Sequence, residues 1–209
     1  MLSFLARTAP LALLAASLVA CGQGTPAPEA SLPATARPLA FPAQTPGELP
    51  GVPAELAVPG GNRLTRRVVG VGVQVYTCAA LGGVSTWTFR APQADLYGAE
   101  RGVFRKVGTH YAGPTWEDGA DGSTVVGRVL RSVPAPPSTP PAIPWLLLEA
   151  RATTPARSGQ PGAFKGTTLV RRLYTLGGTA PTTGCDASRV GAEARVPYAA
   201  LYEFFAPTP

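Results

Sequence analysis

Side chains that could perform chemistry are concentrated in the segment 110–123. It contains the single histidine of the chain and three carboxylates, and its candidate site residues are His110, Tyr111, Trp116, Glu117, Asp118 and Asp121. Glycoside hydrolysis uses two carboxyl groups, one of them a general acid, so Glu117 with Asp118 or Asp121 could form such a pair. The two aromatic rings could then stack against a sugar. The oxygens of the two aspartates could instead contribute to a calcium site.

The same residue types also build ordinary turns, and this is the interpretation that we prefer. Gly-Pro and Asp-Gly pairs favour tight turns, and aspartate side chains accept hydrogen bonds from the turn backbone. Trp116 and His110 would then pack against a sheet. The segment does not match an EF-hand calcium loop, because Ala120 stands where an oxygen ligand is required. A turn, a ligand or calcium site and a catalytic pair therefore all stay open.

Other patterns of catalysis and cofactor binding are missing from the sequence. One histidine and the distant cysteines Cys78 and Cys185 cannot by themselves provide a tetrahedral zinc site. The sequence has no P-loop and no Gly-x-Ser-x-Gly nucleophile motif, and Gly70-Val71-Gly72 lacks the third glycine of a dinucleotide-binding loop. We therefore expect no metal and no cofactor.

The formal net charge of +6 does not by itself indicate nucleic-acid binding. Such binding needs clustered basic residues, whereas here they are scattered, and we expect no nucleic-acid partner. Arg171 and Arg172 form one of two arginine doublets. Adjacent side chains of a strand point to opposite faces, so one of these two arginines should pair with a carboxylate or cover the rim of the domain. A phosphate or uronate ligand is the alternative for this doublet.

The N-terminal residues have the organisation of a secretory signal that ends at a cysteine. Arg7 provides a positive charge, residues 11–19 form an apolar run, and Ala20 precedes Cys21. This pattern predicts a bacterial lipoprotein, with a signal peptide over residues 1–20 and acyl chains such as palmitate on Cys21. The apolar run is too short to span a membrane, and an unmodified signal peptide is the alternative. We expect a location in the cell envelope, outside the cytoplasm, with the membrane as partner through the lipid anchor.

The remaining chain divides into a linker and one domain. Residues 21–51 are rich in proline and alanine and are expected to form an extended linker, and residues 52–209 a single β-rich domain. Acylation of Cys21 would leave Cys78 and Cys185, and such a pair in an oxidising compartment usually forms a disulfide. Two separately buried thiols are the alternative.

Short runs of β-branched and aromatic residues, separated by Gly, Pro, Asp and Ser, predict a mostly β protein. In residues 67–78 four valines alternate with glycines, Gln74 and Tyr76, so the valines share one face, and the glycines should let another backbone approach closely. The other predicted strands are 86–90, 102–111, 123–131, 143–152, 166–176 and 196–205. The fold class is therefore an antiparallel β-sandwich or barrel of about seven or eight strands, with little helix.

Three further segments carry local predictions. Residues 91–97 are expected to form a short helix or turn, residues 113–122 a turn-rich connection, and residues 134–141 an exposed proline-rich loop. The unbroken apolar run 145–148 is typical of a strand that is covered on both faces.

Several motifs, in this order, resemble the domain-of-unknown-function family 3455, which occurs in secreted bacterial and fungal proteins, some of them appressorium-associated. The motifs are Gly72-Val73-Gln74-Val75-Tyr76-Thr77-Cys78, Trp87-Thr88-Phe89, His110 to Glu117, Ile143-Pro144-Trp145-Leu146-Leu147-Leu148, Arg172-Leu173-Tyr174-Thr175 and Pro197-Tyr198. The resemblance covers about residues 52–205 and implies no established activity. It places the cysteine pair of the family at Cys78 and Cys185, which favours the disulfide, and Ala120 departs from the family pattern.

These observations lead to two functional hypotheses. The preferred one is a cell-envelope lipoprotein whose β domain is a non-enzymatic binding or structural module, with cell-wall or surface polysaccharide as a candidate partner. The alternative is an envelope hydrolase acting on carbohydrate through Glu117 and Asp121. An enzyme needs these carboxylates to converge in a cleft, whereas a binding module needs only an exposed aromatic or basic patch.

Overall fold

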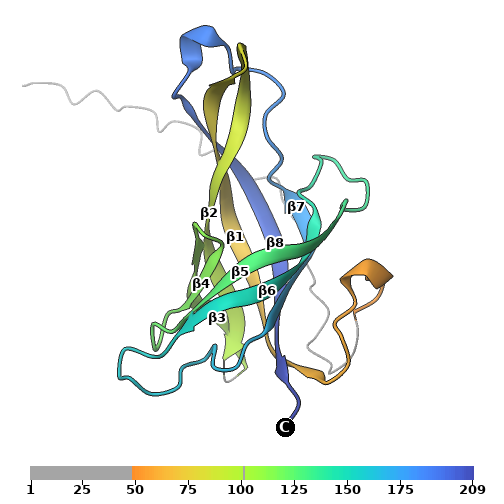
Figure 1. Cartoon of the computed structure of the whole chain (residues 1–209), viewed down its shortest axis with the longest axis vertical. Coiled ribbons are helices and arrows are strands. Elements are labelled where there is room, and N and C mark those ends of the chain that lie inside the picture. The colour runs from red at the N-terminus through yellow and green to blue at the C-terminus, as the bar shows by residue number, and fades with distance from the viewer. Residues whose placement is uncertain (1–48, 101) are drawn as a thin grey trace, which may run out of the picture. The chain divides into compact units, whose positions relative to one another are not determined.

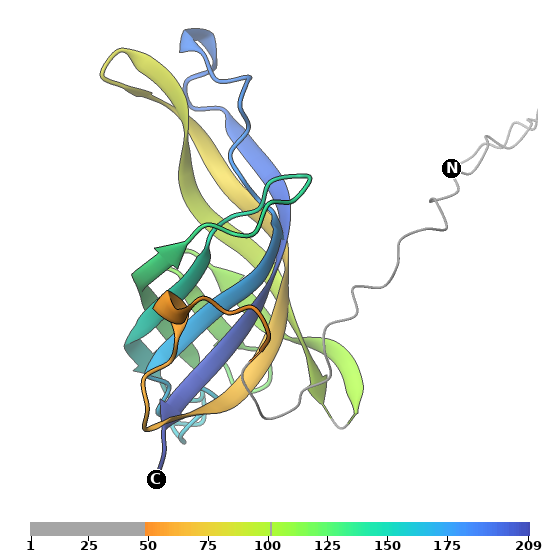
Figure 2. The same ribbon diagram turned by 90° about the vertical axis from the view of Figure 1, so that its right-hand side faces the viewer.

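An unbroken ring of antiparallel pairing defines the fold. The computed structural model describes residues 49–100 and 102–209, in which each strand pairs with the next until β8 returns to β1 and closes a barrel (Figures 1 and 2). The strands are β1 (Asn62–Leu81), β2 (Val84–Glu100), β3 (Val103–Tyr111), β4 (Thr115–Asp118), β5 (Thr124–Val133), β6 (Trp145–Thr154), β7 (Leu169–Gly177) and β8 (Glu193–Pro207). The predicted fold class is confirmed, and its form is a barrel of eight strands.

Helices contribute little to the described part of the chain. It contains two short 3-10 helices, η1 (Ala54–Leu56) and η2 (Ala187–Arg189). Within these residues, no helix is long and apolar enough to cross a membrane. The predicted signal peptide, Cys21 and nearly all of the predicted linker lie outside the described residues.

The alternation of β1 decides which of its side chains enter the barrel. Gln74 and Tyr76 line the interior, whereas Val71, on the opposite face, is 48% exposed. The valine face of this strand therefore points outward and the face with the glycines points inward. Strand alternation was read correctly from the sequence, but the more apolar face is not the one that enters the barrel.

Two glycines on the inner face of β1 allow close packing. A Cβ atom at Gly70 would lie 2.7 Å from Cε2 of Tyr202, and one at Gly72 would lie 2.5 Å from the Cα of Ala94 on β2. Real Cβ atoms almost never approach a neighbour this closely, so any larger residue would force the strand or the tyrosine ring to move. The expected close approach at these glycines is confirmed.

One local prediction is wrong and another incomplete, because long-range pairing outweighs local turn signals. Residues 91–97, expected as a helix or turn, are the middle of β2 and pair with residues 69–75 of β1. Pro92 has no N–H to donate, and it lies next to an irregularity in the β1–β2 register, where a proline is tolerated. The segment 113–122 is turn-rich as predicted, with turns at 112–114 and 119–121, but between them it contains the short strand β4, which pairs with β3 and β5.

Two other local predictions are confirmed. Residues 134–141 form a mostly exposed connection outside the strands. In β6, Leu146 and Leu148 line the interior, while Trp145 and Leu147 on the outer face are only 4% and 5% exposed. The apolar run is thus covered on both faces.

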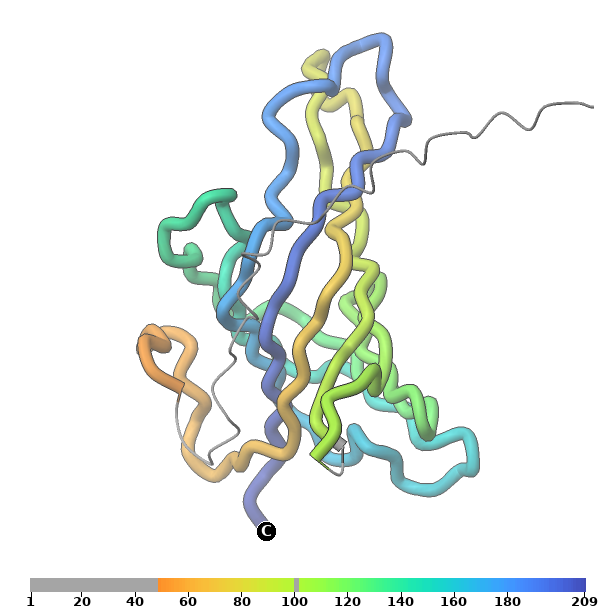
Figure 3. The backbone as a smooth tube through the Cα atoms, turned by 180° about the vertical axis from the view of Figure 1, so that it is seen from behind, coloured from red at the N-terminus to blue at the C-terminus, as the bar shows by residue number. Residues whose placement is uncertain are grey.

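Strands β7, β8 and β1 run side by side (Figure 3), and a buried ion-pair cluster joins them on the outer side of the barrel. Glu203 of β8 accepts from Nε of Arg67 at 2.6 Å and from Nη2 of Arg171 at 2.7 Å. The residues 49–61 that precede β1 contribute a further contact, because the carbonyl of buried Leu56 accepts from Nη1 of Arg171 at 3.3 Å. The two guanidinium groups compensate the negative charge of the carboxylate, so it can be buried without an unpaired charge.

The β1–β2 hairpin continues beyond the barrel and lies beside the segment that precedes β8, at the top of Figure 1. We call residues 77–88 together with residues 178–192 the extension. A disulfide joins Cys78 to Cys185, and the amide of Gly191 donates to the carbonyl of Cys78 at 2.8 Å. The predicted disulfide is therefore confirmed, and it holds the two parts of the extension together.

The disulfide closes a loop of 107 residues, which restricts the unfolded chain more than the folded one. Replacing both cysteines, Cys78→Ala with Cys185→Ala, should lower the free energy of unfolding by about 4 kcal/mol. Urea unfolding of the two proteins at pH 7 measures the difference. Reduction of the wild-type protein with dithiothreitol should give the same loss, and equal stability in all three samples would contradict the expectation.

Candidate ligand-binding cavity

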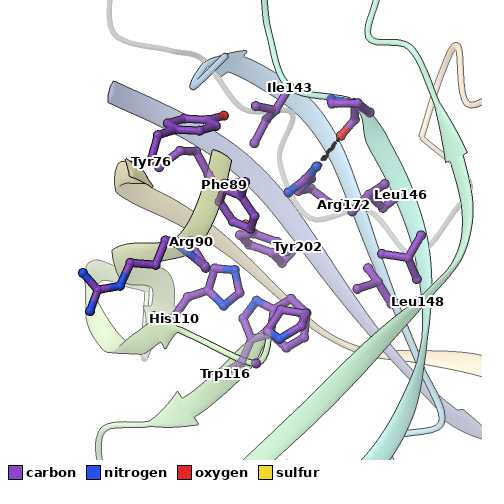
Figure 4. A pocket seen from close by; sticks show the side chains of 16 residues that line it. Tyr76, Phe89, Arg90, His110, Trp116, Ile143, Leu146, Leu148, Arg172 and Tyr202 are labelled. Carbon is purple, nitrogen blue, oxygen red and sulfur yellow. Dashed lines mark hydrogen bonds between the residues drawn. The ribbon is translucent and has the colours of Figure 1, made fainter. Parts of the chain in front are cut away.

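The interior of the barrel is filled unevenly. Val107, Val125, Phe164 and Phe204 belong to a packed core in which each is 6% exposed or less. Toward the base of the extension a cavity of about 440 Å³ remains, within the size range of small-molecule pockets (Figure 4). Its lining includes Gln74, Tyr76, His110, Trp116, Arg172 and Tyr202.

Aromatic rings form one wall of this cavity. The ring of His110 stacks on Trp116, with centroids 4.5 Å apart and planes at 5°. Tyr202 meets both rings edge-on, at 5.1 Å and 5.4 Å. Leu146 and Leu148 of β6 add apolar surface from another part of the wall (Figure 4). Stacked and edge-on rings stabilise one another beyond the area they bury, so this wall is preorganised.

His110 is a neutral member of the wall. Its Nδ1 lies 2.8 Å from the carbonyl oxygen of Thr115. Because a carbonyl can only accept, Nδ1 carries the proton and Nε2 is left as an acceptor. Burial lowers the pKa of His110 to about 3, and the charge of Arg172 acts in the same direction, while the bond to Thr115 opposes them. The imidazole is therefore uncharged at any physiological pH.

Arg172 brings a positive charge to the cavity. Its Nε and Nη2 donate to the carbonyl of Pro144 at 3.1 Å and 2.7 Å, and the cavity lining contains neither aspartate nor glutamate. Gln74 is 2% exposed, and its Nε2 has no hydrogen-bond partner among the described residues. The hydroxyls of Tyr198 and Tyr202 lie 3.3 Å apart, and burial raises the pKa of both, so both stay protonated. The wall is mostly apolar with a few polar groups, as in ligand pockets.

The structure divides the sequence-predicted cluster between two faces. His110 and Trp116 point into the barrel and line the cavity. Tyr111 and Glu117 lie on the outer face, where the tyrosine hydroxyl donates to Oε2 of the glutamate at 3.0 Å. Nη2 of Arg157 pairs with the other oxygen of Glu117 at 2.9 Å. The two-residue period of β3 and β4 therefore separates the aromatic wall from the carboxylate.

The two aspartates of the cluster lie at the turn after β4. Asp118 accepts from the amides of Ala120 and Asp121 through Oδ1, and pairs with Arg66 through Oδ2 at 2.6 Å. Asp121 accepts from the amides of Ser123 and Ala163, at 2.7 Å each. Burial opposes ionisation of Asp121, but these bonds outweigh it and lower the pKa. Both aspartates thus act as turn residues, as in the preferred interpretation.

These positions bear on the catalytic and calcium hypotheses. Every carboxylate of the segment already has a partner: Glu117 has Tyr111 and Arg157, and the aspartates have the turn backbone and Arg66. In the described ranges, no three His, Cys, Asp or Glu side chains are grouped so that they could hold a metal ion. The geometry therefore offers no support for a catalytic pair or a calcium site in this segment.

Several cavity residues were not singled out from the sequence. Gln74 and Tyr202 lie on the inner faces of β1 and β8, and Tyr76 joins them at the base of the extension, where its hydroxyl donates to the carbonyl of Gly178 at 2.6 Å. A usable signal was the polar, glycine-containing face of residues 67–78, since a strand face that is too polar for a packed core can line a cavity.

The fold and site define a class: a closed, eight-stranded antiparallel barrel with an internal cavity that opens beside a disulfide-linked extension. The family described as protein of unknown function DUF3455 matches residues 59–206, and the chain belongs to this family. The resemblance noted in the sequence is thereby confirmed. No curated protein and no solved structure matches the chain.

The buried neutral His110 should make stability depend on pH. Since its pKa is about 3 in the folded protein and about 6.5 in the unfolded chain, only the unfolded chain gains this proton between these values, and stability falls as the pH falls. Between pH 7.5 and pH 5 the wild-type protein should lose about 2 kcal/mol of unfolding free energy. Urea unfolding at both pH values measures this loss.

The variant His110→Gln provides the comparison, because it cannot take up the proton. Its loss between pH 7.5 and pH 5 should be well below 1 kcal/mol, since carboxylates titrate mainly at lower pH. Equal pH dependence in the two proteins would show that another group causes it.

Proposed function

We propose that this protein binds a small, largely apolar molecule inside its barrel. The observation that carries the proposal is the uneven filling of the interior, in which a cavity of about 440 Å³ adjoins a packed core. Eight strands enclose an interior that side chains can either fill or leave open for one small ligand. The side chains on one part of this wall leave it open.

The chemistry of the wall supports the same proposal. Trp116, Tyr202 and His110 offer apolar ring faces and edges, and Leu146 and Leu148 add aliphatic surface. Nε2 of His110, which is left as an acceptor, can orient a bound molecule by a hydrogen bond.

The size of the cavity also bears on which partner the protein binds. Cell-wall or surface polysaccharide is a long polymer, which needs an open groove, whereas a cavity of about 440 Å³ within a barrel suits a molecule of drug-like size. We therefore favour a small ligand. The function remains that of a non-enzymatic binding module.

We further propose that the protein acts in the cell envelope, held to a membrane by acyl chains on Cys21. The signal-like residues 1–20, the small residue before Cys21 and the proline-rich residues that follow support this location. The disulfide between Cys78 and Cys185 agrees with it, because such bonds persist in oxidising compartments. In this arrangement residues 21–51 serve as a tether between the membrane and the barrel.

N-phenyl-1-naphthylamine, a neutral aromatic dye that brightens in apolar surroundings, tests the binding proposal. The wild-type barrel should bind it saturably, and Leu146→Trp, which fills the cavity, should weaken binding at least about tenfold, or about 1.4 kcal/mol. Val71→Trp on the outer face is the matched control and should leave binding unchanged. A wild-type barrel that does not bind the dye, or equal binding by the two variants, would contradict the proposal.

The proposed anchor is tested by fractionating cells that produce the full chain. Cys21→Ala removes the acylation site, so the variant should move from the membrane fraction to the soluble fraction, because acyl chains supply about 0.8 kcal/mol of membrane affinity for each buried methylene. Ser31→Ala, in the predicted linker, serves as the control, since it leaves both the predicted anchor and the disulfide intact. A Cys21→Ala protein that still sediments with membranes would place the anchor elsewhere.

A further inference from the structure

Arg172 differs from the other arginines that the fold shields from solvent. Among the described residues, four arginines are buried or half-buried. Arg66 pairs with Asp118, and Arg67 and Arg171 pair with Glu203. Arg172 is hydrogen-bonded to uncharged partners, the carbonyl of Pro144 and the side chain of Tyr202, and no carboxylate lies in the lining of its cavity.

The side chain of Arg172 lies on the inner face of β7. Arg171 of β7 forms an ion pair with Glu203 of β8 on the outer side of the barrel. Arg172 is the next residue of the strand, so its side chain lies on the inner face. Pro144 holds the guanidinium through Nε and Nη2, which fixes the group at the cavity wall (Figure 4). The positive charge of Arg172 acts on groups around the cavity, because it acts to lower the pKa of both Tyr202 and His110.

From these contacts we infer that the ligand of the cavity is an organic anion, whose carboxylate or similar acidic group pairs with Arg172 while its apolar body lies against Trp116 and Leu148. The inference rests on the proposed function and names the class of its ligand. A guanidinium in a mostly apolar wall is matched best by a planar anion that accepts two of its N–H groups.

The mouth of the cavity agrees with this assignment. Arg90 lies at the edge of the lining and is 67% exposed on its side chain, so the cavity has a second basic residue and no acidic one. Arg90 pairs with Glu193 at 3.2 Å, an exposed contact that contributes little. Figure 4 shows the Arg90 guanidinium directed away from the cavity, so Arg172 is the basic group that an anion inside would meet.

Two dyes that differ by one charged group provide the test. 1-Anilinonaphthalene-8-sulfonate carries a sulfonate, and N-phenyl-1-naphthylamine has the same rings without it. Arg172→Met should weaken binding of the sulfonate at least about tenfold, because a hydrogen-bonded charge partner is lost, and should change binding of the neutral dye less than about twofold. Arg128→Met removes an arginine that pairs with Glu149 on the outer face, and should leave both affinities unchanged.

Two further measurements decide the test if the methionine variant does not fold: the sulfonate affinity of Arg172→Lys, and a displacement assay on the wild-type protein. The lysine keeps the charge but loses the planar fork, so its affinity for the sulfonate should lie between the other two. In the wild-type protein, 1-naphthoate should displace N-phenyl-1-naphthylamine at a concentration at least about tenfold lower than 1-naphthylmethanol does.

The outcomes separate the two proposals. The anion assignment is overturned if 1-naphthoate displaces the neutral dye no better than 1-naphthylmethanol does. It is also overturned if Arg172→Met keeps the wild-type affinity for the sulfonate. In both cases the binding function stands. Failure of the wild-type protein to bind either dye overturns both.

Discussion

Closure of the ring between β1 and β8 is the constraint on which the rest of the structure depends. The two strands pair from Asn62 with Pro207 to Thr77 with Glu193, and only this pairing turns a meander of hairpins into a barrel with an inside. The buried cluster of Arg67, Glu203 and Arg171 joins β1, β8 and β7 on the outer side of the same seam. An uncompensated charge there would be costly, so the cluster holds the three strands in one register.

The cavity is a consequence of how side chains of different size meet across that seam. Gly70 of β1 leaves room for the ring of Tyr202 on β8, and this ring in turn contacts Trp116 and His110. The rings are thereby gathered on one wall, where they pack against one another, and the space opposite them is not filled. A larger residue in place of Gly70 would displace the tyrosine and with it the wall.

Local patterns were sufficient for the fold class, the strand alternation and the disulfide, because each depends on neighbouring residues or on a count of cysteines. They failed at residues 91–97 and missed the short strand β4 within 113–122, because there pairing with other strands overrides turn-forming residues. The composition of the segment 110–123 drew attention to its carboxylates, yet strand pleating sent His110 and Glu117 to opposite sides of the wall. Whether a face points inward follows from closure, which no local pattern contains.

Arg171 and Arg172 are adjacent residues of β7 whose side chains lie on opposite faces of the barrel wall. Arg171 stabilises the seam through Glu203, and its neighbour Arg172 brings the same chemical group to the cavity, where a carbonyl of Pro144 is its fixed partner. The guanidinium of Arg172 is half-buried, and its partners, the carbonyl of Pro144 and the side chain of Tyr202, are uncharged. No aspartate or glutamate in the cavity lining compensates its charge. The outer arginine has a carboxylate of this chain for that purpose, and the inner one faces the space where a ligand would lie.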